Sequence, residues 1–251
     1  MLTLGWSDGN SFVPMALSML SSPNDKNRLA PMRDGIDKRT IGYKRRQESM
    51  RKSTDVLVDM VSLAMTAETG ARHLLLLDSW FAFPATIRRI KALGMQTICM
   101  LKDTGKVTYE LQGWPLPLKD LYKSVRKRCG RAKVLAEVLV AIGSDDQGIP
   151  VSAKIVFVRD RSSKKWLAFL STDTTLTAEE IIKLYKLSVP SFTLSAMRCG
   201  RLSLKKHWHC CLIYWKKPWA TLLDCVKNRY SDRLSDLLRH YQEFSESLCY
   251  F

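Results

Sequence analysis

The sequence predicts an α/β protein with a mixed sheet, flanking helices and a β-rich insertion. The run Leu74–Leu77 is apolar without alternation, which is typical of a strand buried on both faces. A helical pattern over residues 84–94 and a second apolar run over 97–101 follow, so this stretch reads as a strand–helix–strand unit. From residue 134 onward, alternating apolar and polar residues predict further strands that belong to the insertion.

The first part of the chain predicts a hairpin and then a helix. Two apolar runs, 2–6 and 12–17, flank Asp8-Gly9, a pair typical of hairpin turns. Residues 21–43 are polar and predict a long loop. The predicted helix follows the basic cluster at 44–46 and ends near Gly70. Its buried face consists of Leu57, Val61, Ala64 and Met65.

The later elements carry local start and stop signals. Pro84 is favoured at the first position of a helix and Gly94 just after its end, with Ile87, Ile90 and Leu93 as the buried stripe. Strands are expected at about 134–142, 151–158 and 166–170. Thr177 and Glu180 form a capping box, which starts a last helix with Ile181, Leu184 and Tyr185 facing inward. Because Val189-Pro190 disfavours helix, we expect this helix to end within about one turn of Tyr185.

Composition favours a polyanionic partner. The chain has 251 residues, a formal net charge of +16 and a pI near 9.7. Such an excess of cations points first to nucleic acid. The seven cysteines form no CxxC pair, and no apolar stretch is long enough for a signal peptide or a membrane span. We therefore expect a cytoplasmic, nucleoid-associated protein that binds DNA, has no membrane association and keeps its cysteines reduced.

Two clusters of cations are candidates for contact with the DNA backbone. Residues 119–133 contain seven lysines or arginines and one acid, and Tyr122 and Trp114 lie nearby in the sequence. Phosphate neutralisation by such cations releases counterions, which drives binding. A solvated charged face is the alternative explanation. The candidate residues are Lys44, Arg45, Arg46, Lys123, Arg126, Lys127, Arg128, Arg131 and Lys133.

Asp78 is the candidate catalytic and metal-binding residue. It follows directly on the buried strand, at the edge where open α/β sheets bind ligands. Alternatively, it ends the strand and caps the residues that follow. A phosphatase with an aspartyl nucleophile would also have an Asp after an apolar strand, but it would need a second Asp at position 80, which is Trp.

Several segments together resemble the DDE-type transposases of insertion-sequence family four. They are MLTLGWSDGNSFVPMALSMLSS (1–22), KRRQES (44–49), STDVLVDMV (53–61), LLLLDSWFAFP (74–84), IGS and GIPVSAKIVFVRDR (142–161), and WLAFLSTDTTLTAEEIIKLY (166–185). The resemblance covers about residues 1–186. It implies a ribonuclease H-like fold with a β-rich insertion, cut-and-paste DNA transposition, and a homodimer as one arrangement of the intact family.

In that family, three acids hold two Mg²⁺ (or Mn²⁺) ions that promote phosphoryl transfer to or from DNA. Asp78 matches the second acid. The first acid belongs to a strand that would precede residue 1, and Asp8 in its turn is no substitute. The third belongs to a Tyr–x₂–Arg–x₃–Glu–x₆–Lys motif. Tyr185 matches its first position, but Ser188, Phe192 and Cys199 occupy the others.

The resemblance therefore predicts a partial core over residues 1–102, the insertion over 103–175, the start of the last core helix over 176–188 and an off-pattern tail over 189–251. We hypothesise that a frameshift near Lys186 produced this tail; a disordered tail is the alternative. Without the first strand, two unpaired strand edges would face a gap between the hairpin and the Asp78 strand. We expect such a chain to aggregate unless another strand or a partner fills the gap.

A single matching acid predicts a catalytically incomplete fragment that does not bind the metal pair stably. The alternative is a DNA-binding remnant without chemistry. A zinc site at 207–211 would need ligands spaced more widely than His207, His209, Cys210 and Cys211 are. The tryptophans at 208, 215 and 219 can form a stacking surface or serve as apolar filler.

Overall fold

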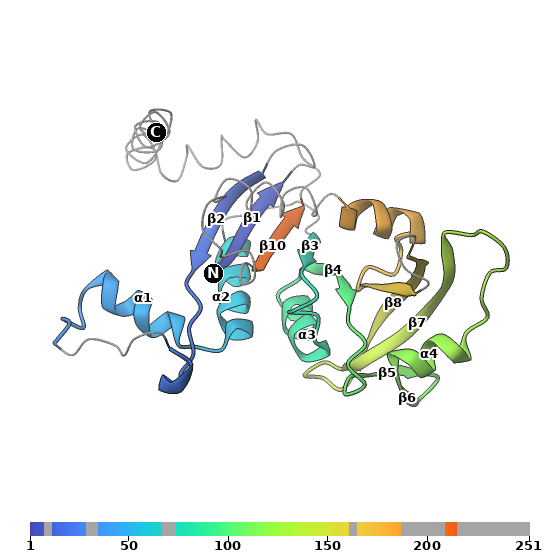
Figure 1. Ribbon diagram of the computed structural model, residues 1–251, viewed down its shortest axis with the longest axis horizontal. Coiled ribbons are helices and arrows are strands. Elements are labelled where there is room, and N and C mark those ends of the chain that lie inside the picture. Colours follow the sequence, from blue (N-terminus) through green and yellow to red (C-terminus); the bar gives the residue numbers. More distant parts are fainter. Residues whose placement is uncertain (8–11, 29–34, 67–73, 161–164, 187–208, 215–251) are drawn as a thin grey trace. The chain divides into compact units, whose positions relative to one another are not determined.

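The computed structural model describes residues 1–7, 12–28, 35–66, 74–160, 165–186 and 209–214 (Figure 1). These residues belong to the compact unit Met1–Trp215. The predicted α/β class is confirmed, with a mixed sheet in which most neighbouring strands are antiparallel. The ten described strands are ordered β2-β1-β10-β3-β4-β9-β8-β7-β5-β6.

The opening hairpin is formed by β1 (Leu2–Ser7) and β2 (Phe12–Ser18), which pair antiparallel as predicted. A 3-10 turn (Asp25–Asn27) follows within the expected loop, and then α1 (Ile41–Ser49) and α2 (Ser53–Thr66). The basic cluster at 44–46 is thus part of a separate helix, not a segment before a single helix. Thr40 begins α1 because its hydroxyl accepts a hydrogen bond from the Tyr43 amide at 3.2 Å. The expected helix end near Gly70 lies outside the described residues.

The predicted strand–helix–strand unit is present. It consists of β3 (Leu74–Leu77), α3 (Pro84–Ala92) and β4 (Gln96–Leu101), with β3 and β4 parallel. The helix begins at Pro84, and Gly94 follows its end with a φ of +85°, a conformation that glycine adopts without steric cost.

The insertion extends the sheet beyond β4. It comprises β5 (Thr108–Leu111), β6 (Trp114–Pro117), α4 (Leu118–Ser124), β7 (Val134–Ser144), β8 (Pro150–Arg159) and β9 (Trp166–Ser171). β9 pairs antiparallel with both β4 and β8, so the insertion and the first part of the chain form one continuous sheet. The last helix among the described residues, 178–186, begins at the predicted capping box: Glu180 accepts a hydrogen bond from the Thr177 amide at 2.8 Å.

Buried side chains form a cluster on each face of the sheet. The larger cluster joins Leu75 and Leu77 of β3 to α2 and α3, and the smaller joins Leu76 to the helix at 178–186 through Ile181 and Ile182. Val56, Leu57, Met60 and Val61 are the buried residues of α2, whereas Ala64 and Met65 are partly buried. β3 is therefore covered on both faces, as its unbroken apolar sequence predicts.

One strand comes from the predicted off-pattern tail. Residues His209–Tyr214 form β10, which lies between β1 and β3 at the position where the resemblance predicts a gap (Figure 1). It pairs with β1 in parallel and with β3 antiparallel. The two strand edges are therefore paired, because another strand of the same chain fills the expected gap. Residues 209–214 of the predicted tail therefore belong to the sheet.

Candidate functional site

Asp78 lies at the carboxyl end of β3, where the sequence placed it. Its Oδ1 accepts hydrogen bonds from the Ser79 hydroxyl at 3.0 Å and from the Trp80 amide at 3.4 Å. The Asp78 carbonyl accepts from the amide of Phe81 at 3.0 Å, so the four residues close a turn. A structural role for this carboxylate, which the sequence left as an alternative, is therefore supported by its contacts.

The aromatic residues after Asp78 point in different directions. Phe81 is fully buried in the larger cluster, whereas the Trp80 side chain is 52% exposed. The Lys102 ammonium lies 5.6 Å from the centre of the Trp80 ring, which is within cation–π range. This edge of the sheet therefore presents an indole and a cation next to Asp78.

A pair of magnesium ions needs several oxygen ligands from different elements. In the described part of the chain, no three His, Cys, Asp or Glu side chains are grouped closely enough to hold a metal. Asp103, which follows the parallel strand β4, forms an ion pair with Lys119 at 3.2 Å. Glu180 is engaged in the capping box, also as the sequence indicated. Asp8, Ser188, Phe192 and Cys199 lie outside the described residues.

The direction of β10 is also relevant to this edge. Because β10 is antiparallel to β3, its carboxyl end pairs with the start of β3: Tyr214 faces Leu74 and Leu212 faces Leu76. Asp78 follows the carboxyl end of β3, so the carboxyl end of β10 lies beside the other end of that strand. A strand that supplied a carboxylate beside Asp78 from its carboxyl end would have to run the other way.

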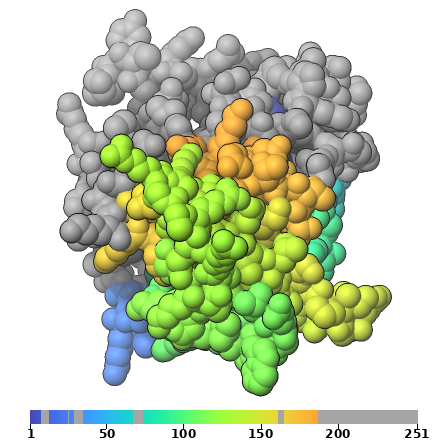
Figure 2. All heavy atoms as spheres, turned by 90° about the vertical axis from the view of Figure 1, so that its right-hand side faces the viewer, coloured from blue at the N-terminus to red at the C-terminus, as the bar shows by residue number. Residues whose placement is uncertain are grey.

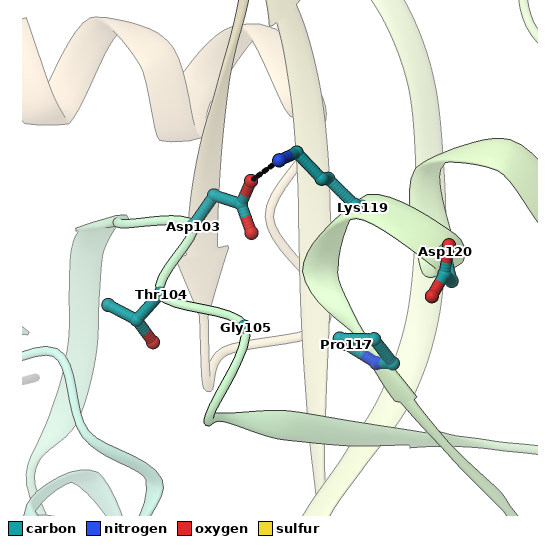
Figure 3. A pocket seen from close by; sticks show the side chains of 6 residues that line it. All are labelled: Asp103, Thr104, Gly105, Pro117, Lys119 and Asp120. Carbon is teal, nitrogen blue, oxygen red and sulfur yellow. Dashed lines mark ion pairs between the residues drawn. The ribbon is translucent and has the colours of Figure 1, made fainter.

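A cavity lies beside α4, where the sequence analysis predicted no site. It has a volume of about 370 Å³ and is lined by Asp103, Thr104, Gly105, Pro117, Lys119 and Asp120 (Figure 3). Both of its carboxylates are paired: Asp103 with Lys119 and Asp120 with Lys123, the latter at 2.8 Å. The Asp120 carboxylate raises the pKa of the exposed Lys123 by a hydrogen bond. The negative charges that line this cavity are therefore each paired with a lysine.

The densely basic segment 119–133 is exposed and has a defined structure. Figure 2 shows the face of the molecule on which the insertion lies, and residues 119–133 belong to the green surface there. The segment consists of α4 and a loop that leads to β7. All six candidate cations of this segment, Lys123, Arg126, Lys127, Arg128, Arg131 and Lys133, are exposed.

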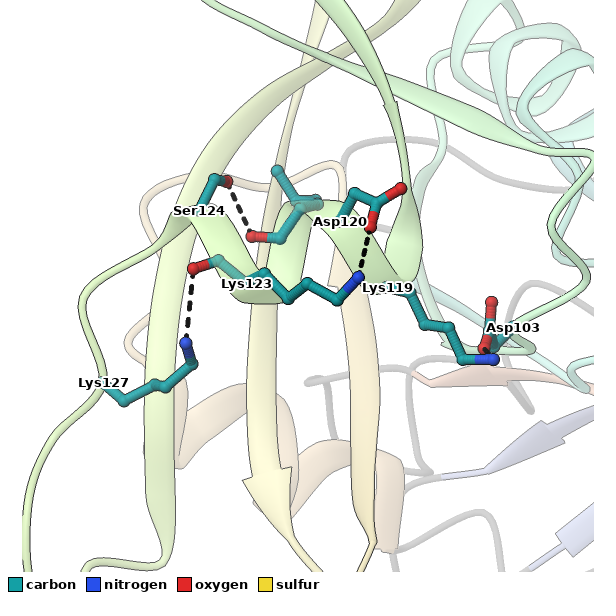
Figure 4. A network of polar contacts seen from close by, with 7 residues as sticks. Asp103, Lys119, Asp120, Lys123, Ser124 and Lys127 are labelled. Atoms are coloured by element: carbon teal, nitrogen blue, oxygen red, sulfur yellow. Dashed lines mark hydrogen bonds and ion pairs between the residues drawn. The ribbon is translucent and has the colours of Figure 1, made fainter.

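Some of these cations have partners within the protein (Figure 4). The Lys127 ammonium donates to the Lys123 carbonyl at 3.3 Å and lies 4.9 Å from the centre of the Tyr122 ring. Arg128 forms an ion pair with Glu137 at 2.7 Å. Arg126, Arg131 and Lys133 form no ion pair with a described carboxylate. Their charges are free to meet an external anion.

The two aromatic residues near the basic segment differ in exposure. Tyr122 packs against Phe157 and Trp166, with ring centres 5.0 and 4.9 Å away, so it supports the segment from beneath. Trp114, on the edge strand β6, is 74% exposed. Of the two, only Trp114 offers a free face for stacking on a base.

The second basic cluster lies elsewhere in the sheet. α1, which carries Lys44, Arg45 and Arg46, contacts β2, and α4 contacts β5 and β6. Since β2 and β6 are the two edge strands, the clusters flank opposite edges of the sheet. In α1, Arg45 pairs with Glu48 at 2.7 Å and Arg46 donates to the Gly42 carbonyl at 2.9 Å. The structure therefore does not combine the two clusters into a single site.

No local sequence pattern marks Glu137, which pairs with Arg128, or Lys102, which lies over the Trp80 ring next to Asp78. The same holds for Arg159 at the end of β8, whose guanidinium group donates to the Gly130 carbonyl of the basic segment at 2.9 Å. In the described residues, no helix is long and apolar enough to cross a membrane. Comparisons of the chain with protein-family models, curated proteins and solved structures gave no match.

Proposed function

We propose that this chain is a DNA-binding protein built on the ribonuclease H-like catalytic fold of the DDE-type transposases, and that it does not itself transfer phosphoryl groups. The fold assignment is supported by the order of elements: an opening hairpin, a parallel strand–helix–strand unit with an Asp after its first strand, and a β-rich insertion before the last helix. The family motifs follow one another in the same order along the sequence.

The observation that carries the proposal of DNA binding is the exposed basic segment 119–133. Three of its cations, Arg126, Arg131 and Lys133, have no carboxylate partner in the described part of the protein. Uncompensated cations on one surface neutralise phosphates and release counterions, which gives affinity for DNA of any sequence. We therefore expect binding that is strongly dependent on salt and weakly dependent on sequence.

The second part of the proposal, that the chain does not transfer phosphoryl groups, depends on which carboxylates could bind metal ions. Asp78 is hydrogen-bonded within its own turn, and the carboxylate after the neighbouring strand, Asp103, is paired with Lys119. One carboxylate cannot position two divalent ions about 4 Å apart. No step through a metal ion is derived for this chain.

Binding can be measured by fluorescence anisotropy with a short DNA duplex between about 50 and 200 mM salt. In the double variant Arg126→Gln/Arg131→Gln, the slope of log K against log salt should decrease in magnitude by about 1.8, because two phosphate contacts are lost. The matched control is Arg51→Gln/Arg89→Gln. It removes the same charge from exposed arginines that are already paired with Asp59 and Asp55, and it should retain most of the slope.

Two results would contradict the proposal. If the wild-type chain does not bind DNA, or if both double variants lose the same slope, the basic segment is only a solvated face. If a supercoiled plasmid is nicked in the presence of Mg²⁺ and the nicking is lost in Asp78→Ala, the chain is an enzyme and the second part of the proposal is wrong.

A further inference from the structure

The loop after α4 is held in one conformation by backbone contacts. The Arg128 amide donates to the Leu135 carbonyl at 2.7 Å, which joins the start of the loop to β7. Between them, Gly130 has a φ of +79°, a left-handed conformation that disfavours residues with a Cβ. The loop therefore turns sharply between two of the free cations, Arg126 and Arg131.

Arg159, at the end of β8, makes three contacts with the same loop. Its Nη2 donates to the Gly130 carbonyl at 2.9 Å, its Nε to the Ala132 carbonyl at 3.3 Å, and its backbone amide to the Lys133 carbonyl at 2.9 Å. The guanidinium group thus bridges two carbonyls that are two residues apart, on either side of Arg131. Arg159 lies 26 or more positions from each of these residues in the sequence, so a distant part of the chain fixes the shape of the basic loop.

These contacts distinguish Arg159 from its basic neighbours. Its guanidinium group is directed at carbonyl oxygens of the loop, so two of its five N–H donors are used within the protein. The side chains of Arg126, Arg131 and Lys133 have no such acceptor in the described residues. Arg159 is therefore placed to order the loop, whereas Arg126, Arg131 and Lys133 are placed to contact phosphates.

We propose that Arg159 is a positioning residue for DNA binding: it preorganises residues 128–133 so that the free cations are held toward the DNA backbone. This inference rests on the proposed function of the basic segment. A loop that is ordered before binding loses less conformational entropy on binding, which is a gain in affinity without a new contact. Lysine cannot replace the arginine, because a single ammonium does not reproduce the planar fork that spans both carbonyls.

The test compares Arg159→Lys and Arg159→Gln in the full chain, by DNA-binding anisotropy and by hydrogen exchange of residues 128–135. Arg159→Lys keeps the charge, so the roughly three- to tenfold weaker DNA binding expected for it reports lost preorganisation. Arg159→Gln also removes a charge and should bind at least as weakly as Arg159→Lys. Both should also exchange the amides of residues 128–135 faster, while the β8–β9 amides retain their protection and show that the fold is intact.

Arg28→Lys is the matched control. Arg28 also bonds two backbone carbonyls, those of Ser22 at 2.6 Å and Pro23 at 2.7 Å, but it orders a different loop. This variant should leave both DNA affinity and the exchange of residues 128–135 unchanged.

The alternatives give different results. If Arg159→Lys binds like the wild type and only Arg159→Gln is weakened, Arg159 contacts a phosphate directly and the proposal is overturned. It is equally overturned if the exchange of residues 128–135 is the same in wild type and both variants. If the wild-type chain does not bind DNA at all, the proposed function fails, and faster exchange in Arg159→Lys would then show only that Arg159 orders the loop.

Discussion

The placement of β10 predicts that one proline in this strand loosens the β1–β2 hairpin and β3 but not the insertion. Leu212 is a suitable position because it is paired on both sides, with Gly5 of β1 and with Leu76 of β3. Proline has no amide hydrogen, so Leu212→Pro removes one hydrogen bond of the ladder and leaves a carbonyl of a neighbouring strand without its donor.

The size of the effect follows from burial. β1 is buried along its whole length, and Leu75, Leu76 and Leu77 of β3 are fully buried, so water cannot replace the lost donor. Removing the donor while its acceptor carbonyl stays buried costs about 1–3 kcal/mol. A typical domain is stable by about 5–15 kcal/mol, so the variant should fold but open locally.

Hydrogen exchange measured by mass spectrometry distinguishes local from global opening. In Leu212→Pro, peptides from β1 and β3 should exchange faster, because β10 is the strand that joins them in the sheet. Peptides from β7, β8 and β9, which pair with one another and with β4, should keep their protection. Leu212→Val is the control, since valine keeps the amide hydrogen and suits a strand.

The reasoning is refuted if Leu212→Pro leaves the exchange of β1 and β3 at the wild-type rate. That result would mean that residues 209–214 do not occupy the position between these strands. A different result would be that Leu212→Val loses as much protection as Leu212→Pro, and in every strand. That result would show that the Leu212 side chain, and not the backbone hydrogen bonds, matters at this position.

Two further predictions concern single side chains. Cys129 is exposed in the basic loop, whereas Cys99 is fully buried and burial raises its pKa to about 12. A maleimide should therefore label Cys129 and spare Cys99 in the native chain, and bound duplex DNA should protect Cys129; labelling that is indifferent to DNA would place the loop away from the interface. The hydrogen bond from Arg89 lowers the pKa of Asp55, so this pair contributes stability above about pH 3.8 that is lost as the pH falls further. Because both side chains are exposed, Asp55→Asn should cost only about 0.2–1 kcal/mol at neutral pH in urea unfolding, and a loss of several kcal/mol would contradict this.

Much of the fold could be predicted from the sequence because the signals are local. The unbroken leucines of residues 74–77 require burial on both faces, and the clusters around Leu75 and Leu76 provide it. Asp-Gly between two apolar runs indicated the hairpin, and the Thr177–Glu180 pair indicated the start of the last helix, where the reciprocal hydrogen bonds are present. In each case the residues that determine the element are within a few positions of one another.

The sequence also determined the chemistry that this chain can bring to a site: a single Asp after a buried strand, and a dense run of cations at 119–133. Only the tertiary structure decided how these residues act. It paired Asp103 with Lys119 and brought Arg159 to the carbonyls of the basic loop. It also placed His209–Tyr214 between β1 and β3, in a direction that puts its carboxyl end beside the start of β3 and not beside Asp78. Strand pairing depends on backbone groups that every residue has, so the sequence of a short strand does not specify its neighbour or its direction.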